Sequence, residues 1–393
     1  MPDGREPATI NVLSSINEVT ADEWDACAGP DNPFLSHGFL AALEDSGSAG
    51  TDAGWLPRHL GIRDDAGQLI ACAPLYLKSH SYGEYVFDWG WAEAYERAGG
   101  RYYPKLLSAV PFTPVTGPRL LVRDGLPEPL RGDLADALAA GMVQLAERLG
   151  VSSLHITFPT EAEWQRLGRR GLLLRTAQQF HWQNRGYGSF DDFLADLTSR
   201  KRKAIRKERS EVAKHGLSIH ALTGGDITEG HWDAFFGFYL NTSDKKWGSS
   251  YLNREFFSLL GERVGRNVVL VFVEDAGRPV AGALNMVGGD TLYGRNWGCL
   301  ADYKFLHFEA CYYQAIDYAI AHGLKWVEAG AQGPHKVQRG YLPRQTYSAH
   351  WIADPGLRAA VEGFLAEERR SMEMEMRMIS ARSPFRKGGN QGR

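Results

Sequence analysis

The stretch that decides the fold is Glu328-Ala-Gly-Ala-Gln-Gly-Pro-His-Lys-Val-Gln-Arg-Gly-Tyr-Leu-Pro343, which continues a short apolar run, Leu324-Lys-Trp-Val-Glu328. The apolar run is typical of a buried strand that follows a helix, so this part of the chain predicts an α/β arrangement. Gly330, Gly333 and Gly340 allow backbone conformations that other residues avoid, and they let a ligand approach the main chain closely. We therefore expect a functional loop at the carboxyl end of this strand.

The polar residues of this loop indicate what it could bind. His335, Lys336 and Arg339 supply cations, and Gln332 and Gln338 supply neutral donors. Cations together with exposed N–H groups form sites for anions. The structural alternative, a surface turn made soluble by its charges, stays open because loops often carry both charge and function.

The composition is that of a globular protein with more than one domain. The chain has 393 residues, of which 44% are hydrophobic and 23% charged. This length predicts about two to three domains, at roughly 150 residues each. The formal net charge of -3 argues against a protein that binds DNA over its whole surface, so any polyanion site must be local.

Cysteine usage and hydropathy bear on the compartment. The 4 cysteines form no CxxC pair, which argues against a zinc site or a disulfide framework and predicts no metal. The N-terminus lacks the features of a signal peptide. Apolar runs such as Val268-Val-Leu-Val-Phe-Val273 are far shorter than the ~20 residues of a membrane span. We expect a cytoplasmic protein that is not membrane-embedded, and we leave a peripheral membrane contact open.

Three ordered matches indicate an internal duplication. They are separated by about 210 residues, as expected for a duplicated unit of that size. The matching pairs are Asp65-Ala-Gly-Gln68 with Asp275-Ala-Gly-Arg278, Trp89-Gly90 with Trp297-Gly298, and Tyr102-Tyr103 with Tyr312-Tyr313. In this alignment each copy has a hairpin, a further strand (Tyr85-Val-Phe-Asp-Trp89 in the first copy), a Trp-Gly loop and a helix. The sequence therefore predicts two related α/β domains in tandem.

The expected boundaries follow from this alignment. The first domain covers residues 1–185, the second covers 186–380, and a basic, Gly-rich segment at 381–393 is expected to be a flexible tail. The strand that ends near Phe158 is followed by none of the Gly, His, Lys and Arg chemistry found after Glu328. We therefore place the active cleft in the second domain.

A strongly basic helix opens the second copy, at about residues 189–215. Within residues 200–209 there are seven cations and a single acid, Glu208. Such a block repels itself without a partner, which favours a polyanion contact through Arg202, Lys203 and Arg206. A solvated helix face is the alternative.

The polar residues near the expected strand ends fit acyl transfer to an amine. No P-loop, GxSxG, HExxH or dinucleotide GxGxxG set is present. Acyl transfer needs a base, a donor to the developing oxyanion and an anchor for the acyl carrier. The catalytic candidates are Glu309, Glu328 and His335 as bases and Tyr341 as proton donor; the substrate-binding candidates are Trp89, Arg295, Trp297, His307, Gln332, Lys336 and Arg339. Each of these residues also has a structural alternative, such as a helix-start carboxylate or a buried ion pair.

At this point several motifs carry a family likeness. They are Leu292-Tyr-Gly-Arg-Asn-Trp-Gly-Cys299, Leu306-His-Phe-Glu-Ala-Cys-Tyr-Tyr-Gln314, the loop 330–343, Asn32-Pro-Phe-Leu-Ser36, Ala73-Pro-Leu-Tyr-Leu-Lys78 and Val110-Pro-Phe-Thr-Pro-Val-Thr-Gly117. Together they resemble the FemAB-like branch of the GNAT acyltransferase superfamily, over about residues 12–370. The resemblance implies an α/β chain of two tandem GNAT-like domains, each with a mixed sheet flanked by helices, in the bacterial cytoplasm.

The resemblance also implies an N-acyltransferase whose acceptor is an amine, including one on a cell-wall precursor. Fem enzymes take amino acids from aminoacyl-tRNA, whereas other GNAT relatives use acyl-CoA, so both carriers remain open as donors. The usual GNAT pyrophosphate loop, Q/R-x-x-G-x-G/A, is not evident in the chain. Two alternatives remain: a non-catalytic RNA-binding protein that uses the helix at 200–209, and a duplicated scaffold without catalysis.

Overall fold

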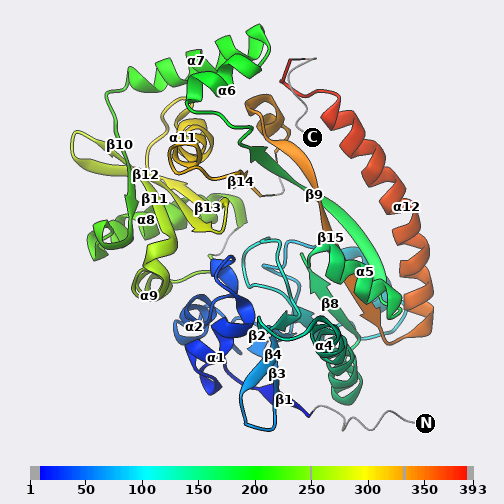
Figure 1. Ribbon diagram of the computed structural model, residues 1–393. Helices are drawn as coiled ribbons and strands as arrows, with labels where there is room; N and C mark the ends of the chain where they lie inside the picture. The colour runs from blue at the N-terminus through cyan, green and yellow to red at the C-terminus, as the bar shows by residue number, and fades with distance from the viewer. Residues whose placement is uncertain (1–8, 248–249, 331–332, 387–393) are drawn as a thin grey trace. The chain divides into compact units, whose positions relative to one another are not determined.

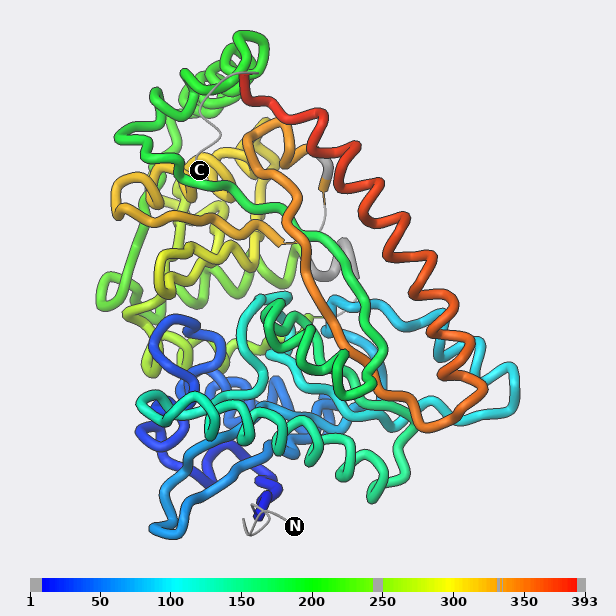
Figure 2. The backbone as a smooth tube through the Cα atoms, turned by 45° about the vertical axis from the view of Figure 1, so that its right-hand side comes forward, coloured from blue at the N-terminus to red at the C-terminus, as the bar shows by residue number. Residues whose placement is uncertain are grey.

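The computed structural model describes residues 9–247, 250–330 and 333–386. The chain divides into two compact units. The first contains the residues up to Ala177 together with Thr346–Ser371; the second contains Gln178–Gln345 and the residues from Met372 onward. The chain passes from one unit to the other within single elements, namely β9 (Leu173–Gln183), β15 (Leu342–Ile352) and α12 (Pro355–Ser380), and Figure 2 traces this path.

The first unit contains two sheets. One is antiparallel, with the order β1 (Ile10–Leu13), β3 (His59–Arg63), β4 (Leu69–Ala73), β7 (Leu121–Val122). The other is mixed, with the order β15, β8 (Ser153–Thr157), β6 (Lys105–Ser108), β5 (Tyr76–Lys78), β2 (Trp55–Pro57), in which only the described pair β6–β8 is parallel. The helices of this unit are α1 (Ala21–Ala28), α2 (His37–Asp45), α3 (Trp89–Arg97), α4 (Glu128–Leu149) and α5 (Glu161–Arg169).

The core of the first unit forms where α4 packs on the strands. Leu134, Leu138, Met142 and Leu145 lie on one face of α4, at the spacing of an amphipathic helix, and they are buried. They pack with inward-facing residues of both sheets, including Leu154. Burial of this stripe removes apolar area from water and holds the helix on the sheets.

The second unit contains one mixed sheet (Figure 1). Its order is β10 (Ser218–Thr223), β11 (Val268–Asp275), β12 (Arg278–Gly288), β13 (Thr291–Cys299), β14 (Trp326–Glu328), β9, in which β13 and β14 are parallel. The helices are α6 (Phe190–Asp196), α7 (Ser199–Ala213), α8 (Glu229–Trp247), α9 (Arg254–Val264), α10 (Leu306–Phe308), a π-helical segment (Glu309–Tyr313), α11 (Gln314–Ala321) and a 3₁₀ helix (Pro334–Arg339). No helix in the described ranges is long and apolar enough to span a membrane.

Each unit completes its sheet with a strand that lies elsewhere in the sequence. β9 follows β8 and α5 in the chain, yet its end pairs with β14, with Trp182 opposite Val327. β15 follows β14 in the chain, yet it pairs with β8, with His350 opposite His155. The predicted boundary after residue 185 therefore differs from the division of the compact units, which falls at Ala177 and returns Thr346–Ser371 to the first unit.

The expected flexible tail also differs from the structure. Residues 381–386 are described and packed: Phe385 is buried and forms a β-bridge with Leu197, and the Arg386 amide donates to the Asp196 carbonyl. The remainder of the expected tail, residues 387–393, lies outside the described residues. The prediction followed the basic composition of this segment and overlooked Phe385, which packs in the core.

Part of the internal alignment is wrong. The two Asp-Ala-Gly turns do join hairpins, β3–β4 and β11–β12. However, the predicted strand at 85–89 is a loop, since Tyr85 has φ 58 and Trp89 begins α3, whereas Trp297 lies inside β13. Tyr102 precedes β6, whereas Tyr312 lies in the π-helical segment. The aromatic pairs matched in sequence but occupy different structural positions.

The basic helix expected at 189–215 is two helices. α6 ends at Asp196, and α7 begins at Ser199 after Leu197 and Thr198, which are extended. Leu197 is fully buried at this break. The break gives α7 a direction of its own, and it turns some of its charged residues toward the second unit's core.

Candidate functional site

Glu328 lies at the carboxyl end of β14, where the sequence placed the functional loop. It pairs in parallel register with Tyr293 of β13. Its Oε1 accepts a hydrogen bond from Arg295 Nη2 at 2.8 Å, and its Oε2 lies 3.9 Å from His181 Nε2 on β9. Burial lowers the pKa of His181, and the Glu328 charge opposes this effect only in part. Three neighbouring strands thus supply a buried ion pair with an adjacent imidazole.

Glu309 opens the π-helical segment between α10 and α11. Wider turns of this kind occur mostly as short insertions in helices, often at functional sites. The carboxylate is 4% exposed. Its Oε1 accepts from Arg209 Nη2 at 2.9 Å and from Gln314 Nε2 at 2.8 Å. Among the described residues, its Oε2 has no hydrogen-bond partner.

Arg209 connects Glu309 to a second acid. Its Nη2 also donates to Asp317 Oδ2 at 2.7 Å, and its guanidinium stacks on Phe190 at 4.4 Å from the ring centre. Burial raises the pKa of Asp317, while the Arg209 charge acts in the opposite direction. Arg209 was expected to be one of the outward cations of α7, and it is instead the cation that holds Glu309 in place.

Arg339 is held by the fold on every side. Its Nη2 donates to both carboxylate oxygens of Glu208 at 2.8 and 2.9 Å, and its Nε donates to Tyr313 Oη at 3.0 Å. Its Nη1 donates to the His335 carbonyl at 2.9 Å, and its guanidinium lies 3.5 Å from the Phe308 ring centre. Arg339 therefore fixes the 3₁₀ helix against α7 and the π-helical segment.

Lys336 and His335 are also tied to neighbouring groups. Lys336 Nζ donates to the carbonyls of Ala329 and Gly330, and burial lowers its pKa to about 8. His335 Nε2 lies 3.1 Å from Tyr312 Oη; burial, assisted by the charges of Arg339 and Lys336, lowers the pKa of His335. A neutral imidazole next to a phenol is able to pass a proton in either direction.

Tyr341 and His307 lie against Tyr312, and Trp297 lies against His307. Tyr341 is fully buried, and its hydroxyl donates to the Tyr312 carbonyl at 3.2 Å. The His307 ring lies 5.4 Å from Trp297, 5.5 Å from Tyr312 and 6.4 Å from His335, measured between ring centres. The structure thus brings His307, His335 and Tyr341 together around the Tyr312 ring, and Trp297 packs against His307.

One predicted residue, Trp89, is not part of this group. Trp89 belongs to the first unit, where it begins α3 and packs against Tyr82 with ring centres 4.9 Å apart. Gln332 lies outside the described residues. The polyanion candidates of α7 stay on the surface: Lys203 and Arg206 are exposed, and Arg206 pairs with Asp191 at 2.8 Å.

The sequence analysis missed several residues of the site. These are His181, Arg209, Gln314, Asp317, Tyr312 and Tyr313. One signal was available for α7, because Ile205 and Val212 are its buried residues and Glu208 and Arg209 lie between them on the same helical face. The π-helical segment has no comparable signature in the sequence.

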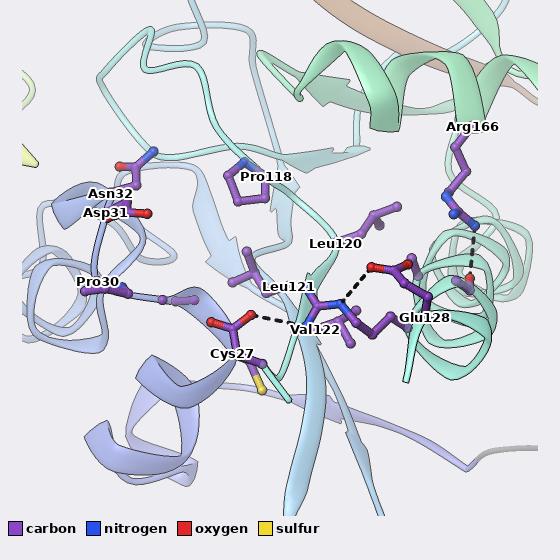
Figure 3. A pocket seen from close by; sticks show the side chains of 16 residues that line it. Cys27, Pro30, Asp31, Asn32, Pro118, Leu120, Leu121, Val122, Glu128 and Arg166 are labelled. Carbon is purple, nitrogen blue, oxygen red and sulfur yellow. Dashed lines mark hydrogen bonds and ion pairs between the residues drawn. The ribbon is translucent and has the colours of Figure 1, made fainter. Parts of the chain in front are cut away.

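A separate pocket of about 430 Å³ lies in the first unit (Figure 3). It is bounded by the end of α1, by β7 and by the first turns of α4. Its cations are already bound, since Arg131 lies 3.1 Å from Asp124 and 3.9 Å from Glu128, and Arg166 donates to the Gly132 carbonyl. The residues that line it, all in the described part of the chain, include none of the predicted site residues.

Comparison with known proteins identifies the family. A sequence model of the FemAB-like family, described as peptidoglycan biosynthesis/recognition, matches residues 15–387. The chain belongs to the FemAB-like family. The family is the one that the sequence motifs resemble. No curated protein matches the sequence at a significant level.

Solved structures share the fold of this FemAB-like chain at low sequence identity. A C-terminal domain assigned to a lysylphosphatidylglycerol synthetase of Agrobacterium fabrum has a TM-score of 0.55 at 9% identity, covering 88% of this chain and 96% of that one. FemX has a TM-score of 0.55 at 12% identity, covering 88% and 98%. A tandem GNAT protein from the clavulanic acid biosynthesis pathway has a TM-score of 0.48 at 13% identity, covering 88% and 99%. The chain is α/β, with sheets and helices in each of its two compact units, and it shares the fold of FemX.

Proposed function

We propose that this FemAB-like chain is an N-acyltransferase whose reaction centre lies in the second unit. It would move an acyl or aminoacyl group from a thioester or an aminoacyl-tRNA to an amine, including an amine on a cell-wall precursor. The family membership supports acyl transfer, and the residues around the π-helical segment support the place of the chemistry.

The observation that carries this proposal is the state of Glu309. One carboxylate oxygen is held by Arg209 and Gln314, and the other has no partner among the described residues although it is buried. A buried acceptor without a partner costs roughly 1–3 kcal/mol, so its persistence points to a role with a ligand. Oε2 would accept a hydrogen bond from the ammonium group of an incoming acceptor substrate.

The proposed reaction uses Glu309 as the base. Glu309 takes one proton from the acceptor ammonium, and the free amine attacks the carbonyl carbon of the donor. A C–N bond forms, and the C–S bond of a thioester or the C–O bond of an aminoacyl ester breaks. After the attack the nitrogen still has one proton more than an amide keeps. His335 and Tyr312, whose Nε2 and Oη are 3.1 Å apart, would pass this proton to the departing sulfur or oxygen, and Glu309 would release the first proton to solvent.

Lys336 and Arg339 have a different role in this proposal from the one expected from their charge. Their donors are engaged with the carbonyls of Ala329, Gly330 and His335 and with Glu208. We propose that they hold the loop and His335 in position. The phosphates of the donor would then meet other cations, for which the exposed face of α7 is the candidate.

The experiment is a transfer assay with two labelled donors. Purified protein is incubated with acetyl-CoA or with a pool of aminoacyl-tRNA and a lysine-containing cell-wall precursor, and labelled amide is measured. Glu309→Gln should lower transfer by about 10²–10⁴-fold, the usual contribution of a general base. The matched control is Glu255→Gln, an exposed carboxylate of α9 in the same unit, which should leave the rate unchanged. Full activity of the Glu309 variant would overturn the assignment.

A second candidate function, RNA binding without catalysis, is favoured by α7 alone. Arg202 is half-buried, and Lys203 and Arg206 are exposed on this helix. If these cations contact single-stranded phosphates, reversing all three should reduce the salt slope of binding by about 2, at roughly 0.7 per contact. An unchanged slope would exclude this face as the RNA contact.

A further inference from the structure

The first unit contains a buried group of four charged residues that the acyl-transfer site does not use. Lys78 on β5 and Lys105 on β6 are directly opposite each other in the antiparallel register, and both are fully buried. Glu84 and Asp88, from the loop at 79–88 that follows β5, are each 3% exposed. We call these four residues the lysine–carboxylate cluster.

Lys105 binds one oxygen of each acid. Its Nζ lies 2.8 Å from Glu84 Oε2 and 2.5 Å from Asp88 Oδ2, and 2.7 Å from Ser81 Oγ. Although burial disfavours its charge, the two carboxylates raise the pKa of Lys105. Lys105 therefore stays an ammonium with its three donors in use.

Lys105 does not bind the second carboxylate oxygen of Glu84 or of Asp88. Glu84 Oε1 and Asp88 Oδ1 are buried and have no hydrogen-bond partner among the residues that the structure describes. Lys78 Nζ lies 3.9 Å from Glu84 Oε1, beyond hydrogen-bond distance. Two buried carboxylate oxygens thus lack the N–H donors that they would accept.

The charges of the cluster do not balance when Lys78 is neutral and both acids are ionised. Burial lowers the pKa of Lys78 to about 7 and raises the pKa of Glu84 to about 7. Although burial favours its neutral form, Lys105 lowers the pKa of Asp88. Above about pH 7 a neutral Lys78, a charged Lys105 and two carboxylates leave one excess negative charge. One added ammonium group would compensate it.

The groups around the cluster do not supply that charge. The other titratable or charged groups that face it are His80, Tyr102, Tyr103, His155, His350 and Arg175. His155 and His350 are buried with Nδ1 atoms 2.6 Å apart, and burial lowers the pKa of both, which keeps them neutral. Arg175 is bound to Glu368 through both Nε and Nη2.

Aromatic faces complete an environment suited to cations. Lys78 Nζ lies 3.7 Å from the centre of the Trp55 ring, and Lys105 Nζ lies 5.6 Å from Tyr102 and 5.8 Å from Tyr103. Acids combined with aromatic faces are the surroundings that recognise ammonium groups.

The loop that supplies both acids also covers them. It contains no helix or strand, and Tyr85 within it adopts φ 58, a conformation that is uncommon for a residue with a side chain. Tyr82 and Phe87 are more than half exposed on its outer side. A ligand would enter by displacing this loop and the flexible side chain of Lys78.

We propose that the lysine–carboxylate cluster of the first unit is a binding site for a primary amine, whose ammonium group takes the place next to Glu84 Oε1 and Asp88 Oδ1. The residues of this site belong to the first unit, whereas those of the proposed acyl-transfer centre belong to the second. Its test needs no acyl donor, so its failure would leave the acyl-transfer proposal standing.

The test is a calorimetric titration of the full chain with n-butylamine, n-butyrate and N-butylacetamide at pH 8. Only the amine should bind. Glu84→Gln and Asp88→Asn should each weaken binding by about tenfold or more, because each removes a charged acceptor from the ammonium. The matched control Glu93→Gln, an exposed carboxylate on α3, should bind as the wild type does.

A variant with the opposite expected effect separates binding from misfolding. Lys78→Met removes the competing amine and keeps an unbranched side chain as far as Cε, so it should bind n-butylamine more tightly than the wild type. Absence of amine binding by the wild type would overturn the proposal. Preference for butyrate, amine binding by both acid variants with the wild-type affinity, or weaker binding by a folded Lys78→Met protein would do the same.

Discussion

Removal of the Glu208 charge should destabilise the second unit, because Arg339 is buried against it. Arg339 donates two hydrogen bonds to Glu208, and the side chains are 8% and 17% exposed. Tyr313 also donates its hydroxyl to Glu208. In Glu208→Gln the guanidinium keeps its bonds to Tyr313 and to the His335 carbonyl but loses its counter-charge.

The size of the effect follows from these contacts. Breaking a buried pair by removing one partner costs about 3–5 kcal/mol, and the contacts that Arg339 retains place the expected loss at the lower end, about 3 kcal/mol. Arg339→Met should cost a similar amount. The double variant should lose clearly less than the sum, with a coupling energy of about 1.5–3 kcal/mol, because no unpaired charge remains.

The assay is native-state hydrogen exchange of peptides that cover α11, which reports the free energy of opening of the second unit. The matched control is the pair of Arg206 and Asp191, an ion pair that involves the same α7 but is 58% and 76% exposed. Its coupling energy should stay below about 1 kcal/mol. Additive effects at Glu208 and Arg339 would refute the reasoning that the pair acts as one buried unit.

Two further predictions concern stability. Lys336 has a folded pKa of about 8, below its ordinary value of 10.5, so the unfolded chain binds more protons between these values. Its contribution should therefore rise as the pH increases from about 8 to 10.5, and urea denaturation of the wild type and Lys336→Met across this range should show the rise only in the wild type. Gly298→Ala should lower the free energy of unfolding by about 1–3 kcal/mol in the same assay, because a β-carbon there would overlap the Phe238 backbone. The control Gly363→Ala, on the open face of α12, should be neutral or stabilising. Equal effects of the two substitutions would contradict this prediction.

Local signals in the sequence were sufficient for much of the fold. The Asp-Ala-Gly turns specify hairpins because glycine accepts the conformation that the turn requires, and Gly67 and Gly277 have φ 78 and 75. The amphipathic pattern of α4 and the strand before Glu328 were likewise readable, since each follows from the spacing of apolar residues. The family motifs then identified the fold class correctly.

Features that depend on contacts between distant residues could not be predicted from the sequence. The loop at 79–88 has alternating aromatic residues like a strand, but Glu84 and Asp88 bind Lys105 and hold it irregular. The pairings of β9 with β14 and of β15 with β8 join segments that are distant in the sequence, and a single sequence contains no signal for them.

The contacts among the candidate site residues could be predicted only in part. Glu328 and Arg295 were both expected, and the structure pairs them at 2.8 Å. The partners of Glu309 were missed because the π-helical segment changes which residues share a face, so helical spacing alone could not place Gln314 and Asp317 beside Arg209.

The most direct test of the central claim is the pH dependence of kcat/KM for amide formation, compared between the wild type and Glu309→Gln. If Glu309 is the base, kcat/KM of the wild type should reach a plateau at neutral pH, because the enzyme supplies the base and does not depend on hydroxide. The variant should lose this plateau and continue to rise with hydroxide concentration from a much lower value. Profiles of the same shape in both proteins would contradict the account and place the base at another residue.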